Sequence, residues 1–145
     1  MTFEENLKKH HINFTRNRVD ILQINVGKLC NQACHHCHVE AGPKRKEIME
    51  KHTVDRILEL LTKGNSVHTI DITGGAPELN PHFQYFVKEV FKLKKKIIDR
   101  CNLTVFFEKD FSEIPYFLKE YQVEIIASLP CYSKDNVDSQ RGRGV

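Results

Sequence analysis

The spacing of apolar residues changes along the chain, and the changes predict strands that alternate with helices. Residues 21–26 place apolar side chains on one face and polar ones on the other, which is the period of a half-buried strand. Residues 48–63 instead carry an apolar stripe at helical spacing, and Gly64 follows as a C-terminal cap. Residues 1–20 are polar with few apolar positions and predict a loosely packed lead-in helix. We expect residues 21–145 to form one core domain.

The same alternation continues along the rest of the chain. Further strands are predicted at residues 67–73, 102–107 and 123–129. Asn80 and Pro81 are suited to cap and begin a helix, and a short helix is predicted to start near Pro115. Strands that alternate with helices imply βαβ units and a parallel sheet. The predicted fold class is therefore α/β, with about four βα units.

One face of each predicted strand is polar. The polar positions are Gln23 and Asn25, then Thr69, Asp71 and Thr73, then Asn102 and Thr104, and finally Glu124 and Ser128. A parallel sheet covered on both faces usually has strands that are apolar throughout. The polar face therefore either lines a cavity or lies in water. We favour the cavity, because function in parallel α/β folds gathers at the carboxyl ends of the strands.

The composition is that of an ordinary small globular protein. The chain has 145 residues, 40% of them hydrophobic, and a net charge of +3 with scattered Lys and Arg. The densest basic run, residues 92–96, falls at the end of a predicted helix, where cations complement the helix dipole. Nucleic acid is therefore not an expected partner. No apolar run approaches the roughly 18 residues of a membrane span, so we expect no membrane partner either.

The cysteines indicate a metal centre. Three of the five, Cys30, Cys34 and Cys37, lie in one loop after the first predicted strand, with no fourth nearby. Their crowding and the odd total argue against disulfides and for a reducing, cytoplasmic setting. Thiolates favour iron–sulfur clusters or zinc, and a site with three protein ligands keeps one coordination position open for chemistry. His35 and His38 beside them keep zinc as an alternative.

A glycine pair ends the second predicted strand. Gly74 and Gly75 are followed by Ala76 and Pro77. Glycine lets the main chain approach a ligand closely, and proline stiffens the turn. Taken alone, this run is typical of an ordinary strand-to-helix turn. Its position, one crossover after the cysteine loop, favours a role beside the metal.

The cysteine spacing and the place of the glycine pair resemble the radical S-adenosylmethionine (radical SAM) superfamily. The resemblance implies a partial (βα) barrel in which Cys30, Cys34 and Cys37 hold a [4Fe-4S] cluster. It also implies that the fourth iron binds SAM, and that an electron delivered through the cluster cleaves SAM to methionine and a 5′-deoxyadenosyl radical. An electron donor such as a flavodoxin or ferredoxin is implied as a partner.

The resemblance also implies roles for single residues. The glycine motif of the family, here residues 74–77, meets the SAM amino group through its backbone. An acidic residue is usual at the third position of that motif, and Glu78 is a candidate substitute for it. His36 stands where an aromatic residue commonly packs near the adenine, and a histidine can stack. Ser128 is placed to contact the SAM ribose or the substrate, and Arg100 is a candidate partner of the SAM carboxylate.

A longer pattern resembles one branch, the arsenosugar-biosynthesis radical SAM proteins and their Cys-rich relatives. The matching stretches are CNQACHHCHVEAGP (30–43), ITGGAPELNP (72–81), DRCNLT (99–104), ASLPCY (127–132), DNVD (135–138) and QRG (140–142). The branch implies a small-molecule substrate, a methylated trivalent arsenical to which the 5′-deoxyadenosyl group is attached. Cys131, after the fourth predicted strand, is a candidate catalytic residue as a soft ligand for arsenic. A free cysteine such as Cys101 is by default a small buried apolar residue.

The family core has six strand–helix units, and this branch adds a cysteine-rich C-terminal region. Only four units are countable here, so we expect a truncated, N-terminal portion of a radical SAM enzyme. Two alternatives stay open. One is a radical SAM enzyme with another substrate, and the other is a non-catalytic module that binds zinc or an iron–sulfur cluster.

Overall fold

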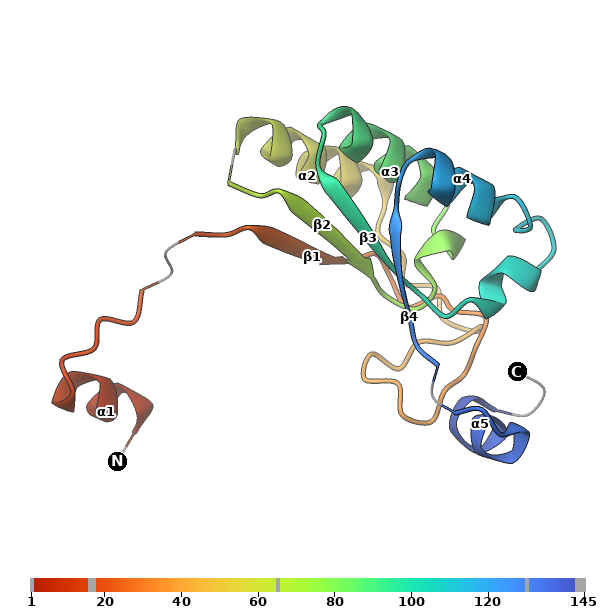
Figure 1. Cartoon of the computed structure of the whole chain (residues 1–145), viewed down its shortest axis with the longest axis horizontal. Coiled ribbons are helices and arrows are strands. Elements are labelled where there is room, and N and C mark those ends of the chain that lie inside the picture. The colour runs from red at the N-terminus through yellow and green to blue at the C-terminus, as the bar shows by residue number, and fades with distance from the viewer. Residues whose placement is uncertain (1, 16–17, 65, 130, 143–145) are drawn as a thin grey trace.

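The fold is built on four parallel strands whose order in the sheet is their order in the sequence. In this computed structural model, which describes residues 2–15, 18–64, 66–129 and 131–142, β1 pairs with β2, β2 with β3 and β3 with β4. The strands are β1 (Ile21–Asn25), β2 (Thr69–Thr73), β3 (Lys96–Cys101) and β4 (Glu124–Ala127). The parallel α/β arrangement confirms the predicted fold class (Figure 1).

Three helices cover one face of this sheet. They are α2 (Lys51–Lys63), α3 (Phe83–Lys92) and α4 (Ile114–Glu120), and they lie together above the strands in Figure 1. Short 3-10 turns, η1 (Pro77–Leu79) and η2 (Thr104–Phe107), follow β2 and β3. Two further helices, α1 (Phe3–Lys9) and α5 (Lys134–Arg141), lie outside this layer. α1 has no buried residue and stands apart from the sheet.

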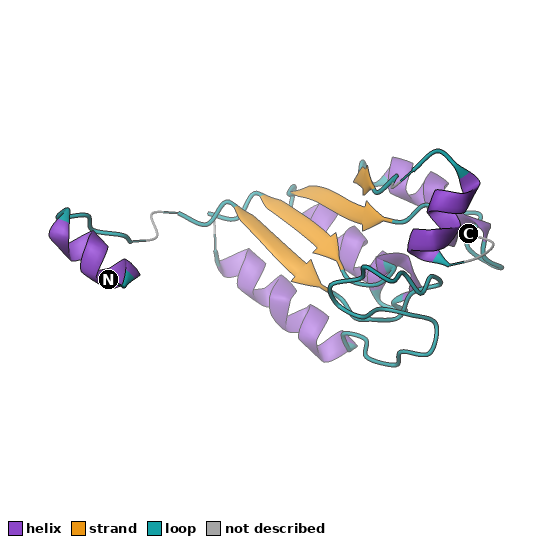
Figure 2. Cartoon of the chain, turned by 90° about the horizontal axis from the view of Figure 1, so that it is seen from below, coloured by secondary structure: helices purple, strands orange, loops and turns teal. Residues whose placement is uncertain are grey.

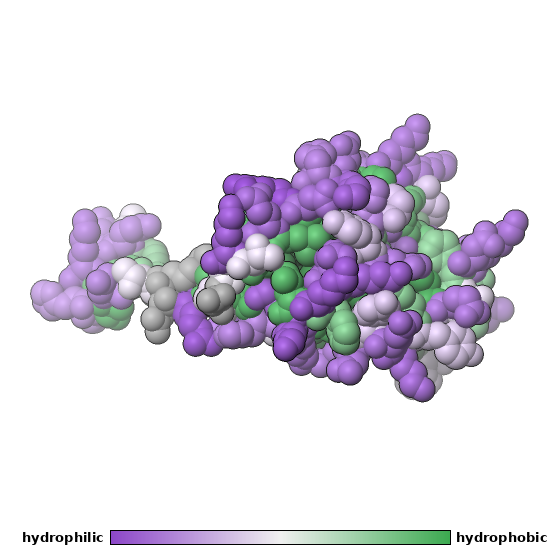
Figure 3. Space-filling view, turned by 90° about the horizontal axis from the view of Figure 1, so that it is seen from above, coloured by the Kyte–Doolittle hydropathy of each residue, from purple (hydrophilic) through white to green (hydrophobic). Residues whose placement is uncertain are grey.

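The hydrophobic core lies between the sheet and the helix layer. Ile70 and Ile72 of β2 are fully buried beneath α2 and α3. The helices contribute the buried side chains of Val54, Leu58, Leu61, Phe83, Phe86, Val87 and Val90. Each large apolar side chain buried in this way contributes roughly 1.5–3 kcal/mol. The outer surface of the helix layer is mostly hydrophilic, with apolar groups visible between the helices (Figure 3).

The second face of the sheet is polar and carries no helix within the described residues. Seen from that side, the strands lie in front of the helices (Figure 2). On this face Asp71 accepts hydrogen bonds from Gln23 at 2.9 Å and from Arg100 at 2.8 Å. Gln23, Asp71 and Glu124 share this face in the strand register, whereas Asn102 and Thr104 lie beyond the end of β3. A cavity opens at the carboxyl end of the face, and Gln23 and Glu124 farther back along the strands are exposed.

The predicted third strand was wrong. Residues 102–107 form a turn and the helix η2, and β3 begins six residues earlier, at Lys96. Two positive φ angles explain the shift: Lys94 (φ 56°) ends α3 and lets the strand start, and Leu103 (φ 65°) ends it. Asn102 then caps the turn, since its Oδ1 accepts from the Val105 N–H at 3.1 Å. The basic run therefore spans the end of α3 and the start of β3.

The other predicted elements are found with shorter bounds. The first, second and fourth strands agree with β1, β2 and β4 to within two residues at each end. The helix predicted from residue 48 begins at Lys51, because Ile48 bridges to Gly27 and the Met49 N–H donates to the Val26 carbonyl at 2.8 Å. α5 was not predicted, and it places a new side chain at the site described next.

Candidate functional site

The cysteine loop is tied into a closed shape directly after β1. The Lys28 N–H donates to the Glu47 carbonyl at 2.7 Å, and the Gly42 N–H donates to the Lys28 carbonyl at 3.0 Å. The Cys30 N–H in turn donates to the Gly42 carbonyl at 3.3 Å. Because these bonds join the two ends of the loop, residues 30–42 are held as one unit at the carboxyl edge of the sheet.

The three thiols gather on the inner side of this loop. Cys30 is 7% exposed, and Cys34 and Cys37 are half-buried. Main-chain N–H groups point at two of the sulfurs, Gln32 to Cys30 at 3.4 Å and Ala41 to Cys37 at 3.3 Å. Burial raises the pKa of Cys30, and the neighbouring thiols of Cys34 and Cys37 raise it further. Three neighbouring thiolates in this partly buried loop would therefore be stabilised by a bound cationic centre.

The three cysteine thiols do not form a compact single-ion site. Among the described residues, the ligand atoms of this loop do not form a group of three within 4.8 Å of one another. A single zinc ion bound at about 2.3 Å to each sulfur needs closer donors than that. The thiols as placed are therefore not a ready single-ion site, and the choice between an iron–sulfur cluster and the zinc that His35 and His38 left open stays a prediction.

The glycine pair packs directly against the cysteine loop. The Gly75 N–H donates to the Gly27 carbonyl and the Ala76 N–H to the Leu29 carbonyl, both at 2.9 Å. A Cβ atom on Gly75 would lie 2.2 Å from the Leu29 oxygen, so no larger residue fits. Gly74 has φ 151°, which favours glycine. The turn after β2 thus forms a close-fitting cradle for the loop, as the predicted role of glycine requires.

A cavity of about 370 Å³ opens between the loop, this cradle and the carboxyl ends of the strands. Its volume is within the usual range for a small-molecule site. The predicted site residues that line it are Cys34, His36, Cys37, Gly74, Gly75 and Ser128. Cys30 lies buried behind it, and the buried Ala76 and Pro77 support the cradle from below. Glu78, the candidate substitute for the acidic motif residue, is buried and does not line the cavity.

Cys131 stands outside this lining. It is half-buried in the segment before α5, with its Sγ 3.6 Å from the Ser133 Oγ. Hydrogen bonds from the Ser133 backbone and side chain lower the pKa of Cys131 to about 7. A substantial fraction of this thiol is therefore ionised at neutral pH. Its predicted role as a soft ligand for substrate stays a prediction.

Sequence reasoning missed one basic residue of the cavity. Arg141, the last residue of α5, is 8% exposed, and its Nη2 donates to the Ser128 carbonyl at 2.6 Å. Burial raises the pKa of Cys34, and the positive charge of Arg141 acts against that rise. The stretch QRG at 140–142 belonged to the longer pattern but gave no indication of its place. A guanidinium beside the cluster loop is suited to bind a carboxylate.

Arg100 also lines the cavity, but its guanidinium already has a partner. Its Nε and Nη2 atoms donate to the two Asp71 oxygens, each at 2.8 Å. This bidentate pair holds the pKa of Asp71 below its usual value and raises the pKa of Arg100. The predicted contact of Arg100 with the SAM carboxylate stays a prediction, and Arg141 is the better-placed candidate.

Behind the cavity, three potential ligands meet in the interior. Glu78, Asp99 and Cys101 bring one ligand atom each to within 4.8 Å of one another. Burial, and then the neighbouring Glu78 carboxylate, raises the pKa of Asp99 to about 9. Burial likewise raises the pKa values of Glu78 and Cys101. The trio was not predicted as a site.

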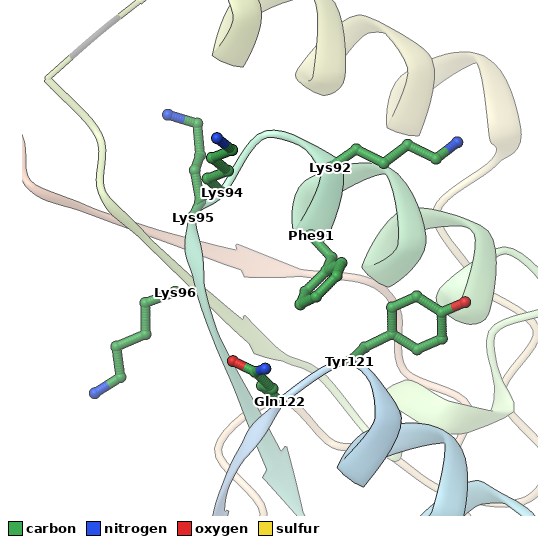
Figure 4. A pocket seen from close by; sticks show the side chains of 7 residues that line it. All are labelled: Phe91, Lys92, Lys94, Lys95, Lys96, Tyr121 and Gln122. Carbon is green, nitrogen blue, oxygen red and sulfur yellow. The ribbon is translucent and has the colours of Figure 1, made fainter.

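A larger hollow of about 680 Å³ lies at the opposite end of the sheet, around Phe91 and Tyr121 (Figure 4). Its lysines point in different directions, and most have a partner already. Lys92 pairs with Glu89, Lys96 pairs with Glu124 and Lys95 donates to the Val67 carbonyl. The hollow is remote from the cysteines and has no cluster of convergent polar groups. The cysteine loop, not this hollow, is therefore the candidate site.

Comparison with known proteins identifies the family. The family model described as "Radical SAM superfamily" matches residues 24–127, which run from the last residues of β1 to the end of β4 and include the three cysteines and the glycine pair. The chain belongs to the radical SAM superfamily. This membership confirms the class of enzymes to which the motifs pointed. It does not reach the arsenosugar branch, which no comparison shows.

One relative is named for peptide biosynthesis, and one similar solved structure contains a precursor peptide. "Putative peptide biosynthesis protein YydG" from Bacillus subtilis (strain 168) is 29% identical over 77 residues, 53% of this chain and 24% of that protein. Crystal structures of Streptococcus suis SuiB also superpose on 96% of the radical SAM chain, with TM-scores of 0.66 for SuiB itself and 0.68 for SuiB bound to precursor peptide SuiA. Their identities are 18% and 21%, so this likeness concerns the fold.

SuiB bound to S-adenosylmethionine gives a TM-score of 0.66 at 17% identity. The chain spans 30–31% of the SuiB chains and 24% of the Bacillus protein, so it corresponds to a minor part of each. Within the described residues, no helix of the radical SAM chain is long and apolar enough to cross a membrane.

Proposed function

We propose that this chain carries the cluster and SAM sites of a radical SAM enzyme, with a [4Fe-4S] cluster held by Cys30, Cys34 and Cys37. When bound, the cluster supplies the electron that cleaves SAM to methionine and a 5′-deoxyadenosyl radical. The observation that carries the proposal is the joint packing of the three-cysteine loop and the glycine cradle, in which Gly75 lies against Leu29 with no room for a side chain.

The residues present fit both groups. Three thiols on one loop, two of them with main-chain N–H groups aimed at their sulfurs, suit an iron–sulfur cluster. The cavity beside them is bordered by Gly74 and Gly75, where the main chain is bare enough to meet a ligand. Three protein ligands leave one iron for an exchangeable ligand. The charge of Arg141 lies on the same wall, where it complements a carboxylate.

Each group around the cavity has a separate task in this proposal. The cradle at residues 74–77 fixes the cysteine loop and offers its backbone to the SAM amino group. Arg141 binds the SAM carboxylate, and Ser128 contacts the ribose or the substrate from the end of β4. His36 packs against the adenine. The Asp71–Arg100 pair stiffens the polar face beside them, since it joins β2 to β3 with two hydrogen bonds.

Anaerobic reconstitution of the full chain with iron and sulfide tests the proposal. We expect about four irons and four sulfides per chain, a brown colour, and SAM binding that perturbs the electron paramagnetic resonance signal of the reduced cluster. Reduction should then release methionine and 5′-deoxyadenosine. Cys34→Ser should lose the cluster, whereas Cys131→Ser should keep it. A colourless protein that contains zinc and no sulfide would refute the proposal.

For the substrate, we propose a methylated trivalent arsenical, to which the 5′-deoxyadenosyl group is attached. The support is the long pattern shared with the arsenosugar branch, together with the Cys131 thiol, whose pKa near 7 provides a soft thiolate close to the carboxyl end of β4. Incubation of the reconstituted protein with SAM, a reductant and dimethylarsinous acid tests this assignment. An adenosylated arsenical detected by mass spectrometry is expected, and its absence while SAM is still cleaved would refute the substrate alone.

A peptide substrate is the second candidate. It is supported by the relatives, one named for peptide biosynthesis and another crystallised with a precursor peptide. The same reaction, run with peptides encoded beside the gene, distinguishes the peptide substrate from the arsenical one. If the substrate is a peptide, the peptide changes mass and no adenosylated arsenical is formed. We further propose a flavodoxin or ferredoxin as electron donor and a cytoplasmic location, since five free cysteines suit a reducing compartment.

A further inference from the structure

Three metal-binding side chains converge in the interior behind the cluster cavity. Glu78 comes from η1, and Asp99 and Cys101 come from β3. Their exposed fractions are 4%, 0% and 2%, and one ligand atom of each lies within 4.8 Å of the other two. Asp99 and Cys101 are two residues apart on one strand, so their side chains share a face. The group is thus built by the fold, and it is separate from the cysteines of the cluster loop.

The carboxylates in this group lack partners. All four side-chain oxygen atoms of Glu78 and Asp99 are buried, and none has a hydrogen-bond partner of ordinary geometry among the described residues, although the Cys101 thiol and the Asp99 carboxyl lie close enough to Glu78 to oppose the rise of its pKa that burial causes. No Lys, Arg or His is paired with either residue in the described ion pairs, which reach Asp71 but neither of these two. Buried polar groups in folded proteins are nearly always satisfied, and buried charges are paired or bind metals. Two carboxylates together without a cation therefore need an occupant.

We propose that Glu78, Asp99 and Cys101 bind a single divalent transition-metal ion, Zn²⁺ by preference, at a site distinct from the iron–sulfur cluster. One thiolate and two carboxylates form a ligand set that zinc accepts, with bonds of about 2.3 Å to sulfur and 2.0–2.2 Å to oxygen. Hard cations such as Mg²⁺ and Ca²⁺ do not favour a thiolate. A divalent ion also reduces the charge of the two carboxylates and the thiolate from −3 to −1, whereas no basic side chain among the described residues is paired with Glu78 or Asp99.

The cluster cavity offers a path to this site. Cys101 lines the cavity on one side and belongs to the buried group on the other. It packs in a small apolar cluster with Cys30, Ala76 and Val105. An ion can therefore reach Cys101 from the cavity before the cluster loop and SAM close it off. A metal here would tie η1, and with it the glycine cradle, to β3.

A shared proton is the competing occupant. If Asp99 stays protonated, its carboxylic acid can donate a hydrogen bond to the Glu78 carboxylate, and the pair then needs no metal ion. That arrangement would also explain why the pKa of Asp99 is raised to about 9. In that arrangement the Cys101 thiol stays protonated and only donates a hydrogen bond to Glu78. The two occupants therefore differ in whether a thiolate takes part.

Cobalt(II) distinguishes them, because a cobalt–thiolate bond adds an intense near-ultraviolet charge-transfer band. We would titrate Co²⁺ into the full chain carrying Cys30→Ser, Cys34→Ser and Cys37→Ser, which removes the cluster ligands. One equivalent of Co²⁺ should bind and produce this band, and added Zn²⁺ should displace the Co²⁺ and remove the band. Adding Cys101→Ser should abolish the band, and adding Asp99→Asn or Glu78→Gln should weaken binding at least tenfold. Cys131→Ser and the exposed Glu120→Gln are the matched controls, and both should leave binding unchanged.

The wild-type holoprotein provides the second measurement, in case the cysteine variants fail to fold. After reconstitution of the cluster and dialysis against Zn²⁺, elemental analysis should find one zinc per chain beside the iron, and Asp99→Asn should lose it. Holoprotein with its full iron content and no zinc would overturn the proposal. Cobalt binding that survives Cys101→Ser would overturn it as well, because the ion would then lie elsewhere.

Discussion

Gly75→Ala is the sharpest test of the contact between the glycine cradle and the cluster loop. The added Cβ would lie 2.2 Å from the Leu29 oxygen, 2.7 Å from the Leu29 carbonyl carbon and 3.0 Å from the Cys30 Cβ. All three atoms belong to the cluster loop, and two are backbone, so a side-chain rotation cannot relieve the overlap. The loop or the cradle must move by about 1 Å to restore ordinary contact.

Two terms set the magnitude. Overpacking of a well-packed site costs about 1–3 kcal/mol. The same movement lengthens the hydrogen bond from the Ala76 N–H to the Leu29 carbonyl, now 2.9 Å, and a lost bond of this kind costs about 0.5–1.5 kcal/mol. The free energy of unfolding should therefore fall by about 2–4 kcal/mol. Cys30 follows Leu29 directly, so the variant should also retain less iron after reconstitution.

Gly42→Ala is the matched control, because it makes the same substitution in the same loop. Its added Cβ meets nothing nearer than the Gln32 oxygen at 3.9 Å, an ordinary contact. We expect a change within about 0.5 kcal/mol and full iron content, measured by urea unfolding of the apoprotein and by iron analysis after reconstitution. If Gly75→Ala unfolds and binds iron like Gly42→Ala, the cradle does not hold the cluster loop.

Three further predictions follow from single contacts. Asn80→Ala should lower the free energy of unfolding by about 2–4 kcal/mol in urea melts. The reason is that the Asn80 Nδ2 donates to the Val26 and Met49 carbonyls and its Oδ1 accepts from the His82 N–H. If Asn80→Ala destabilises the protein no more than the exposed Gln84→Ala does, these hydrogen bonds do not contribute to stability. Arg141→Gln should weaken SAM binding by the reconstituted protein about tenfold in equilibrium dialysis. Lys134→Gln is the control and should bind SAM like the wild type. An unchanged affinity of Arg141→Gln would refute the role of Arg141. In the metal-free protein, the pKa of Asp99 is raised to about 9 from its ordinary value near 3.8. Between these two pH values the folded chain keeps a proton on Asp99 that the unfolded chain has released. The free energy of unfolding should therefore fall as the pH rises through this interval, by up to about 1.4 kcal/mol per pH unit. Asp99→Asn should flatten this slope in urea melts between pH 5 and 9 (roughly the measurable part of the interval), and an unaltered slope would show that Asp99 is not the group that holds the proton.

The fold could be predicted from the sequence where apolar spacing and turn residues agreed. Residues 21–26 and 67–73 alternate regularly and end in polar or glycine-rich turns, so β1 and β2 were found nearly in full. The third strand was misplaced because its boundaries depend on Lys94 and Leu103, two non-glycine residues with positive φ angles. Neither residue type signals a left-handed turn, since that conformation is unusual for both. Tertiary pairing of Lys96 with Thr69 decides the strand instead.

The site divides in the same way between local and distant information. Cys30, Cys34 and Cys37 and the glycine pair form local motifs whose chemistry is legible in a few residues, and the structure brings the two motifs into contact. Arg141 and the group of Glu78, Asp99 and Cys101 have no such local signal. Arg141 reaches Ser128 across 13 residues through the unpredicted α5, and Glu78 meets Asp99 only because η1 packs against β3. Asp99 had no predicted place in a strand or a helix. Its burial at 0% exposure, among groups that give its carboxyl no hydrogen-bond donor of ordinary geometry, is a property of the folded chain alone. Residues of this kind carry no signal in the sequence, but their burial costs free energy unless a partner or a ligand is present. They are therefore the functional candidates in this radical SAM protein that only the structure shows.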